Sequence, residues 1–284
     1  EKSRKLIKIK MNEYHTEKFI NQYEHISRLR LLTDEELSIL KKKRNQFEVS
    51  VRSAKEPKAF IEYIKYEIAL MKKFKQIEYE DEYDERALDK AMSLHIKEIF
   101  RSALKKFQGK RKIWEYYVSF VKQKFPNIVT TIYQEMLHFH HTKDDYIEAV
   151  RHEMSKGNYN VAISFLIQGI SQEKDKDLVV LHIECSLQQA EEEKDEKVRE
   201  NTLAQASKFY AKFLKSSKEV RVHVDLIQKI QKFEFAMSLQ NDILTNMLRA
   251  FRERAEVWDV LARRHLDGLF YDENNEDQES EKNP

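Results

Sequence analysis

The sequence predicts an all-α fold, an α-solenoid built from stacked pairs of helices. Three observations lead to this prediction. Glycine and proline are scarce, with 4 Gly and 3 Pro among 284 residues, and strand-rich folds need many turns that draw on both. Large residues recur three positions apart, as in Trp114, Tyr117 and Phe120, which places them on one helix face. A second helical pattern alternates with the first at a shared period.

The first pattern, called A, reads aromatic-x-x-large-x-x-aromatic and is often followed by Glu. Its copies begin at Phe60, Trp114, Tyr146, Asp177, Ile227 and Trp258. The second pattern, called B, reads apolar-apolar-x-x-small-apolar. Its copies begin at Ile99, Ile132, Phe165, Phe209 and Ile243. In both patterns most copies begin 31 to 34 residues after the previous copy, and the remaining intervals are longer. Each A and B helix is too short to bury its apolar stripe alone, so neighbouring pairs must stack.

The aromatic residues of the A helices are expected to fill the seams between neighbouring pairs. These candidate seam residues are Phe60, Tyr63, Tyr66, Trp114, Tyr117, Phe120, Tyr146 and Trp258. Two charged stretches, one after Phe74 and one after Leu187, add length inside the first and fourth units. They are low in large apolar residues, as solvated helix extensions or loops are.

Three domains follow from these patterns. Residues 1–56 form an N-terminal helical segment, in which Thr33 and Glu36 have capping-box spacing. Residues 57–270 form the solenoid, with about five helix pairs and the first helix of a sixth. Residues 271–284 form an acidic disordered tail. Arg44 interrupts the apolar stripe of the N-terminal segment, so it needs a carboxylate partner or must reach solvent.

Composition narrows the class of protein. The net charge of +2 is too small for a chain that coats nucleic acid along its whole length. No apolar run approaches the length of a membrane span, and the N-terminus lacks the apolar core of a signal peptide. The single Cys excludes an internal disulfide. The chain begins with Glu1 rather than Met, as a fragment would.

No residue pattern indicates an enzyme, a cofactor or a metal site. His138, His140 and His141 are ligand types that zinc uses, yet no further His or Cys is placed to complete four ligands. Cys185 lies on an apolar helix face, as a small core residue does. The acidic runs fit solvated helix faces better than acid–base chemistry. We therefore expect no catalytic, cofactor-binding or metal-binding residues.

Two basic runs are candidate phosphate or partner contacts. They comprise Lys41, Lys42 and Lys43, and Lys110, Arg111 and Lys112. Gly109 precedes the second run as a helix stop would, so that run is expected on a loop. Either run could contact phosphate or act as a nuclear import signal, and a solvated helix face explains each run equally well. A direct RNA-binding module and a protein-binding scaffold thus remain two separate hypotheses.

The alternating A and B patterns resemble the HAT (half-a-TPR) repeat. The segment "LLTDEELSILKKKRNQFEVSVRS" followed by "AFIEYIKYEIALMKKF", together with "EVWDVLARRHLD", resembles one HAT-repeat family. That family is the HAT-repeat subunit of the small-subunit processome, the U-three small nucleolar RNA-associated proteins numbered six. The resemblance touches both ends of residues 12–268. It implies that the later C-terminal repeats of the family are not part of this sequence.

The resemblance implies a non-enzymatic scaffold in pre-rRNA processing and small ribosomal subunit biogenesis. The implied location is the nucleolus. The implied partners are WD40 β-propeller subunits of the same subcomplex and the pre-rRNA/U-three snoRNA particle, with indirect or limited RNA contact. No membrane and no small-molecule substrate are implied. A HAT-repeat scaffold of messenger-RNA processing is a third hypothesis, which the N-terminal segment disfavours.

Overall fold

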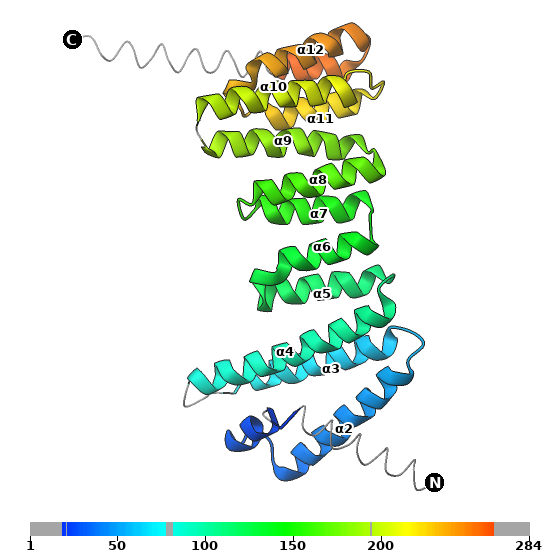
Figure 1. Ribbon diagram of the computed structural model, residues 1–284, viewed down its shortest axis with the longest axis vertical. Coiled ribbons are helices and arrows are strands. Elements are labelled where there is room, and N and C mark those ends of the chain that lie inside the picture. Colours follow the sequence, from blue (N-terminus) through cyan, green and yellow to red (C-terminus); the bar gives the residue numbers. More distant parts are fainter. Residues whose placement is uncertain (1–18, 21, 78–81, 194, 264–284) are drawn as a thin grey trace, which may run out of the picture. The chain divides into compact units, whose positions relative to one another are not determined.

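A computed structural model describes residues 19–20, 22–77, 82–193 and 195–263. Across these residues the regular secondary structure is helical, and they contain no strand (Figure 1). The predicted all-α helical-repeat fold is therefore confirmed. The chain divides into two compact units, unit 1 from Glu1 to His140 and unit 2 from His141 to Pro284. The acidic tail predicted at 271–284 lies outside the described residues.

Unit 1 is built from consecutive helices that each pack on the next one along the chain. After helical residues at 22–28, its elements are α2 (Asp34–Ser53), α3 (Lys58–Phe74), α4 (Glu82–Phe107), α5 (Arg111–Lys124), the 3-10 turn η1 (Pro126–Ile128) and α6 (Val129–Phe139). The contacts run from α2 to α3, α3 to α4, α4 to α5 and α5 to α6. Unit 1 thus stacks each helix on its sequence neighbours, as helical repeats do.

Unit 2 continues the same alternation of helices. Its elements are α7 (Lys143–Met154), α8 (Tyr159–Glu173), α9 (Lys176–Glu193), α10 (Glu196–Phe213), α11 (Val220–Ile230), the 3-10 turn η2 (Glu234–Ala236) and α12 (Met237–Ala250), followed by helical residues at 255–263. The main contacts join α7 to α8, α8 to α9, α9 to α10 and α11, and α11 to α12. The extra charged sequence lengthens helices, since α9 and α10 have 18 residues each and α4 has 26.

The capping box predicted at the start of α2 is present. The Thr33 side chain accepts a hydrogen bond from the Glu36 backbone N–H at 3.2 Å, and Glu36 Oε2 accepts one from the Thr33 N–H at 2.9 Å. Both bonds satisfy amides that the first turn of a helix leaves without partners. Thr142 and Asp195 cap α7 and α10 through their side chains. These three helices also carry acidic residues in the first turn, which the helix dipole favours.

A buried ion pair joins α2 to α3 in unit 1. Arg44 Nε and Nη2 donate to the two Glu67 carboxylate oxygens at 2.8 and 2.7 Å, and the two side chains are 1% and 0% exposed. The rings of Phe19 and Tyr23 lie 4.8 and 5.4 Å from the guanidinium carbon. The sequence required a carboxylate partner for Arg44 or a path to solvent, and the structure supplies the partner.

The Glu that follows the A pattern pairs differently in each repeat. Glu67 holds Arg44, whereas Glu153 accepts a hydrogen bond from the Asn158 side-chain amide at 2.9 Å. Glu184 lies 3.8 and 3.5 Å from the amines of Lys229 and Lys232, respectively. The repeated carboxylate therefore joins its own helix to a different element each time. Such contacts fix how neighbouring elements sit together within a unit.

Candidate functional site

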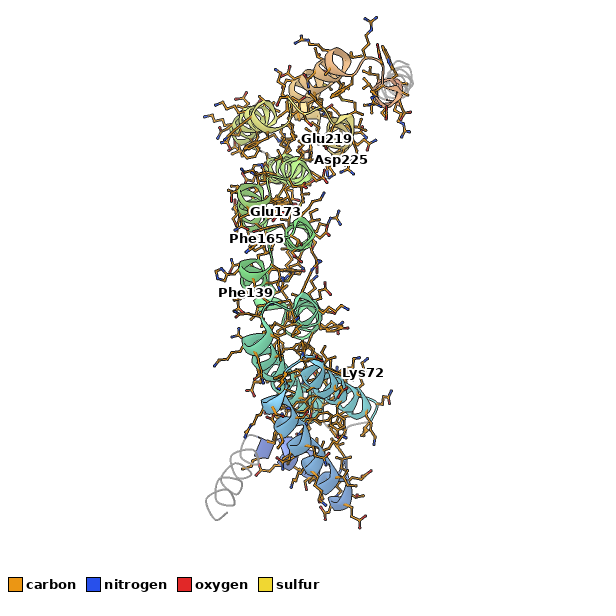
Figure 2. The ribbon with its side chains drawn as sticks, turned by 90° about the vertical axis from the view of Figure 1, so that its right-hand side faces the viewer. Lys72, Phe139, Phe165, Glu173, Glu219 and Asp225 are labelled. Atoms are coloured by element: carbon orange, nitrogen blue, oxygen red, sulfur yellow. The ribbon has the colours of Figure 1, made fainter. Side chains whose placement is uncertain are left out.

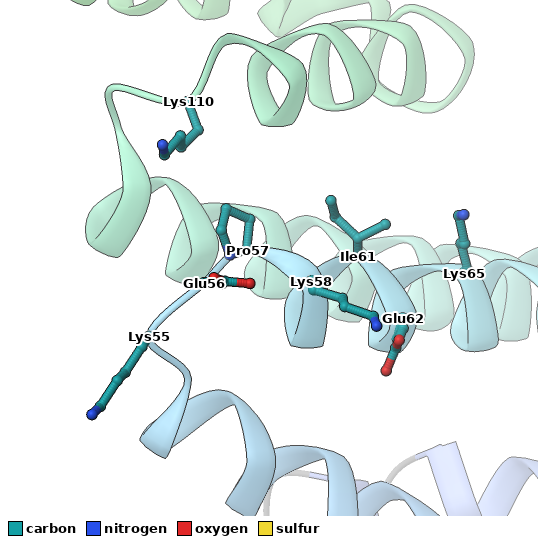
Figure 3. Close-up of a pocket in the computed structure, with 8 residues that line it drawn as sticks. All are labelled: Lys55, Glu56, Pro57, Lys58, Ile61, Glu62, Lys65 and Lys110. Atoms are coloured by element: carbon teal, nitrogen blue, oxygen red, sulfur yellow. The ribbon is translucent and has the colours of Figure 1, made fainter.

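A basic pocket of about 530 Å³ lies in unit 1 at the starts of α3 and α5 (Figure 3). We call it the lysine pocket, and it is lined by Lys55, Glu56, Pro57, Lys58, Ile61, Glu62, Lys65 and Lys110. Lys110 points from the start of α5 towards Pro57, and Lys65 rises from α3 on the side that faces α5. Lys58 lies along α3 near Glu62, while Lys55 points away. Four amines against two carboxylates make the lining net positive.

Neither helix that begins at the lysine pocket has a side chain that caps its first-turn amides. Pro57 precedes α3 and Lys110 precedes α5, and neither helix has a capping side chain or an acidic residue in its first turn. The first N–H groups of a helix carry partial positive charge and lack partners within the helix. The helix starts therefore add to the positive potential that the lysines create.

A smaller, apolar groove adjoins the lysine pocket. This groove, of about 260 Å³, is lined by Ile61, Ile64, Lys65, Ile68, Met71, Lys72, Phe100, Tyr116, Ser119, Phe120, Gln123 and Lys124. Ile61 and Lys65 line both spaces, so the two lie next to each other. Tyr116 is 50% exposed. Figure 2 labels Lys72 of α3 and Phe139 of α6 on opposite sides of unit 1, with Lys72 on the side of the groove.

The basic run Lys41–Lys43 lies in the middle of α2, and all three side chains are exposed. The amines of Lys41 and Lys43 rest over the rings of Tyr23 and Phe47, at 5.1 and 5.3 Å from the centroids. Their long apolar stems thus cover aromatic surface while the charge stays in solvent. The pocket lining does not include this run.

The second basic run divides between different roles. Only Lys110 lines the lysine pocket, whereas Arg111 Nε lies 3.3 Å from Glu115 on the same helix and Lys112 is exposed. The loop predicted for this run is wrong in part, because Arg111 and Lys112 already form the first turn of α5. The chain needs only the short link after Phe107 to pass from α4 to α5.

Most candidate seam residues are buried, although their role in joining repeats stays a prediction. Six of them are buried and Tyr66 is half-buried; the buried ones are Phe60, Tyr63, Trp114, Tyr117, Phe120 and Tyr146. Trp258 departs from this set, since 51% of its surface is exposed. Val257 and Val260 take the buried positions of its helix instead. The spacing identified the correct helix but not the side chain that faces the core.

Trp114 and Trp258 nevertheless share one local contact. Each indole N–H donates to the backbone carbonyl six residues earlier, that of Gln108 or Arg252, at 2.8 Å in both cases. The Trp114 ring also stacks on Phe139 at 5.9 Å between centroids. We call this contact the indole latch, because it ties the start of an A helix to the turn before it.

Two histidines of the run make local contacts, and the single cysteine is buried. His138 and Phe139 meet edge to face at 5.0 Å between centroids, and His140 Nε2 lies 3.1 Å from the Gln108 carbonyl. Burial, with the charge of Glu184 adding to it, raises the pKa of the Cys185 thiol to about 12. Within the described residues, no group of three or more His, Cys, Asp or Glu side chains could hold a metal ion, and no helix has the length and apolarity to cross a membrane.

The lysine pocket was not foreseen as a unit from the sequence. Lys55, Lys58 and Lys65 are spread over the end of one segment and the first turns of the next, and Lys110 comes much later. Pro57 at the start of α3 and the lack of an acidic residue in the first turn of that helix were the available signals. The folded chain brings the four lysines together because α3 and α5 both pack against α4.

The first part of unit 1 is similar to a known protein family. Residues 16–78 match the family model described as U3 small nucleolar RNA-associated protein 6. The matched segment contains both partners of the buried ion pair and three of the four pocket lysines.

Two curated relatives extend the likeness along the chain. The U3 small nucleolar RNA-associated protein 6 homologs of Mus musculus and Homo sapiens are 24% and 23% identical, over 87% of this chain in both cases. The chain spans 45% of the length of each relative. The resemblance inferred from the sequence is thereby confirmed: this chain is similar to proteins described as U3 small nucleolar RNA-associated protein 6.

Proposed function

We propose that this chain is a non-enzymatic scaffold within the small-subunit processome, the U3 snoRNP particle, and that it serves pre-rRNA processing and small ribosomal subunit biogenesis in the nucleolus. The observation that carries the proposal is the likeness to proteins named for association with U3 small nucleolar RNA, which extends over 87% of the chain. Because the chain spans 45% of those relatives, the proposal concerns the part of them that this sequence covers.

The architecture supports a scaffold role. Stacked helix pairs present long surfaces that suit protein partners. Several large apolar side chains are exposed on these surfaces, among them Ile39 at 64%, Tyr83 at 68% and Ile167 at 54%. Apolar residues that gather at contact sites gain most from burial against another subunit. We propose the WD40 β-propeller subunits of the same subcomplex as the proteins that cover them.

An affinity purification tests the proposal directly. A tagged copy of the chain is expressed in cells, and the RNA and proteins that co-purify are measured. Enrichment of U3 RNA and propeller subunits over spliceosomal RNAs is the expected result. Enrichment of spliceosomal RNA without U3 would favour a scaffold of messenger-RNA processing instead. Trp114→Ala serves as the control, because loss of a large buried side chain should disrupt the surface of unit 1.

A depletion experiment tests the processing role separately. Cells that lack the natural protein and express this chain are compared with cells that express no replacement. Restored conversion of precursor to mature small-subunit rRNA supports the proposal for this part of the protein. Full association with U3 RNA without any restoration would show a bound subunit that lacks the processing role.

A further inference from the structure

The side-chain amines around the lysine pocket have no partners within the described part of the chain. Lys58, Lys65 and Lys110 line it without any ion pair, hydrogen bond or ring contact of their amines. Other lysines of unit 1 are engaged, as Lys124 is with Asp89 at 2.7 Å. Lys106 likewise donates to the Arg52 carbonyl at 2.9 Å. The charge of the pocket is therefore available to an anion from outside the chain.

We propose that the lysine pocket holds the phosphate backbone of single-stranded RNA and that Tyr116 provides the adjacent surface on which a base stacks. Proteins that bind single strands without sequence preference combine a positive groove with exposed aromatic side chains. The lysine pocket supplies the first part, and Tyr116, 50% exposed in the adjoining groove, supplies the second. The inference does not depend on the processome assignment.

Phosphate fits the pocket better than the carboxylates of an acidic peptide do. The positive side chains in the lining are all lysines, which act as point charges on flexible stems and suit phosphates presented at any angle. The lining contains no Asn, Gln, Ser or Arg side chain that would pair with a peptide backbone or grip a carboxylate with two bonds. The uncapped starts of α3 and α5 add backbone N–H groups, and phosphate oxygens readily accept hydrogen bonds from such groups.

The contact should be modest and should depend steeply on salt. Each phosphate neutralised on a single strand contributes a slope of about 0.7 to the logarithm of affinity against the logarithm of salt concentration. Three lysines in contact then give a slope of about 2, or about twentyfold weaker binding when the salt concentration is raised fourfold. No base-reading pattern lines the pocket, so sequence preference should be small.

The test measures binding of the full chain to a short fluorescein-labelled oligouridylate by anisotropy across a salt series. In the variant Lys58→Gln/Lys65→Gln/Lys110→Gln the slope should fall by about 2. Tyr116→Ala should weaken binding at least about fivefold while leaving the slope unchanged, and Tyr116→Phe should restore it. Because these side chains are exposed, circular dichroism should show an unchanged fold.

The matched control removes the same charge from the same unit at another place. The variant Lys41→Gln/Lys42→Gln/Lys43→Gln on α2 should leave affinity and slope nearly unchanged. Equal losses in both triple variants would mean diffuse attraction and would overturn the proposal. A peptide of alternating Asp and Leu provides the second probe. If it binds more tightly than the RNA and only its binding is lost in the pocket variant, the site is a peptide site and the proposal is wrong.

Discussion

Removal of one partner from the buried ion pair of unit 1 should be costly. In Glu67→Leu the Arg44 guanidinium keeps its charge but loses both of its carboxylate contacts, at 2.8 and 2.7 Å, while it stays 1% exposed. Burial acts to lower the pKa of Arg44, and the adjacent Glu67 carboxylate outweighs it, so the net pKa is raised. Loss of one member of such a pair lowers the free energy of unfolding by about 3–5 kcal/mol.

The double variant separates an unpaired charge from a change in packing. Arg44→Met/Glu67→Leu replaces both charges with apolar side chains of similar length, on which Phe19 and Tyr23 can still pack. Replacement of a whole buried pair by apolar residues is often neutral or stabilising. The double variant should therefore recover most of the loss that Glu67→Leu causes. A double-mutant cycle with Arg44→Met completes the measurement of the coupling free energy.

Tryptophan fluorescence provides an assay that reports on unit 1. The chain has 2 Trp, of which Trp114 in unit 1 is 2% exposed and Trp258 in unit 2 is 51% exposed. In a Trp258→Phe background, urea unfolding followed by fluorescence records the environment of Trp114 alone. If Glu67→Leu shifts the free energy of unfolding by less than about 1 kcal/mol, the pair does not stabilise the α2–α3 contact as argued.

Three further predictions concern the cores of the units. Trp114→Ala should lower the free energy of unfolding by about 3–5 kcal/mol in a denaturation monitored by circular dichroism. Gly169→Ala should also destabilise, by about 1–3 kcal/mol, because an added Cβ would lie 2.9 Å from Tyr146 Cγ; Gly109→Ala is its control, since nothing lies within 4 Å there. Burial lowers the pKa of His182 to about 4, below the unfolded value of about 6.5, so stability should fall as pH decreases between these values. The variant His182→Gln should flatten that part of the pH profile. The first prediction is wrong if Trp114→Ala unfolds with the same free energy as wild type. The second is wrong if Gly169→Ala lowers the free energy of unfolding no more than Gly109→Ala does. The third is wrong if His182→Gln leaves the pH dependence of stability unchanged.

The helical order could be predicted because helix periodicity is a local property of the chain. Trp114, Tyr117 and Phe120 follow one helix face in the sequence, and all three are buried in α5. The sequence also predicted that Arg44, on an apolar stripe, needs a carboxylate partner or a path to solvent. The identity of that partner was not predictable, because Glu67 reaches Arg44 only through the packing of α3 on α2.

The basic site could not be predicted from adjacent residues alone. The sequence marked runs of neighbouring charges, yet Lys110 reaches the pocket without Arg111 and Lys112. Lys58 and Lys65 stand apart in the sequence and meet Lys110 only when α3 and α5 pack on α4. Charge density along a chain therefore says little about charge density in space. Trp258, which is 51% exposed within the described residues, illustrates a related limit, since periodicity does not show which neighbour covers a side chain.

The indole latch has a consequence for the mechanics of the repeats. A chain of helix pairs bends most easily at the short links between pairs, and a bond from Trp114 to the Gln108 carbonyl removes torsional freedom from one such link. A phenylalanine could fill similar volume but could not donate that bond, which is worth about 0.5–1.5 kcal/mol. The indole therefore stiffens a joint as well as filling space. At the link before Trp258 the ring is half-exposed, and the same bond at 2.8 Å restrains that joint with a smaller contribution from burial.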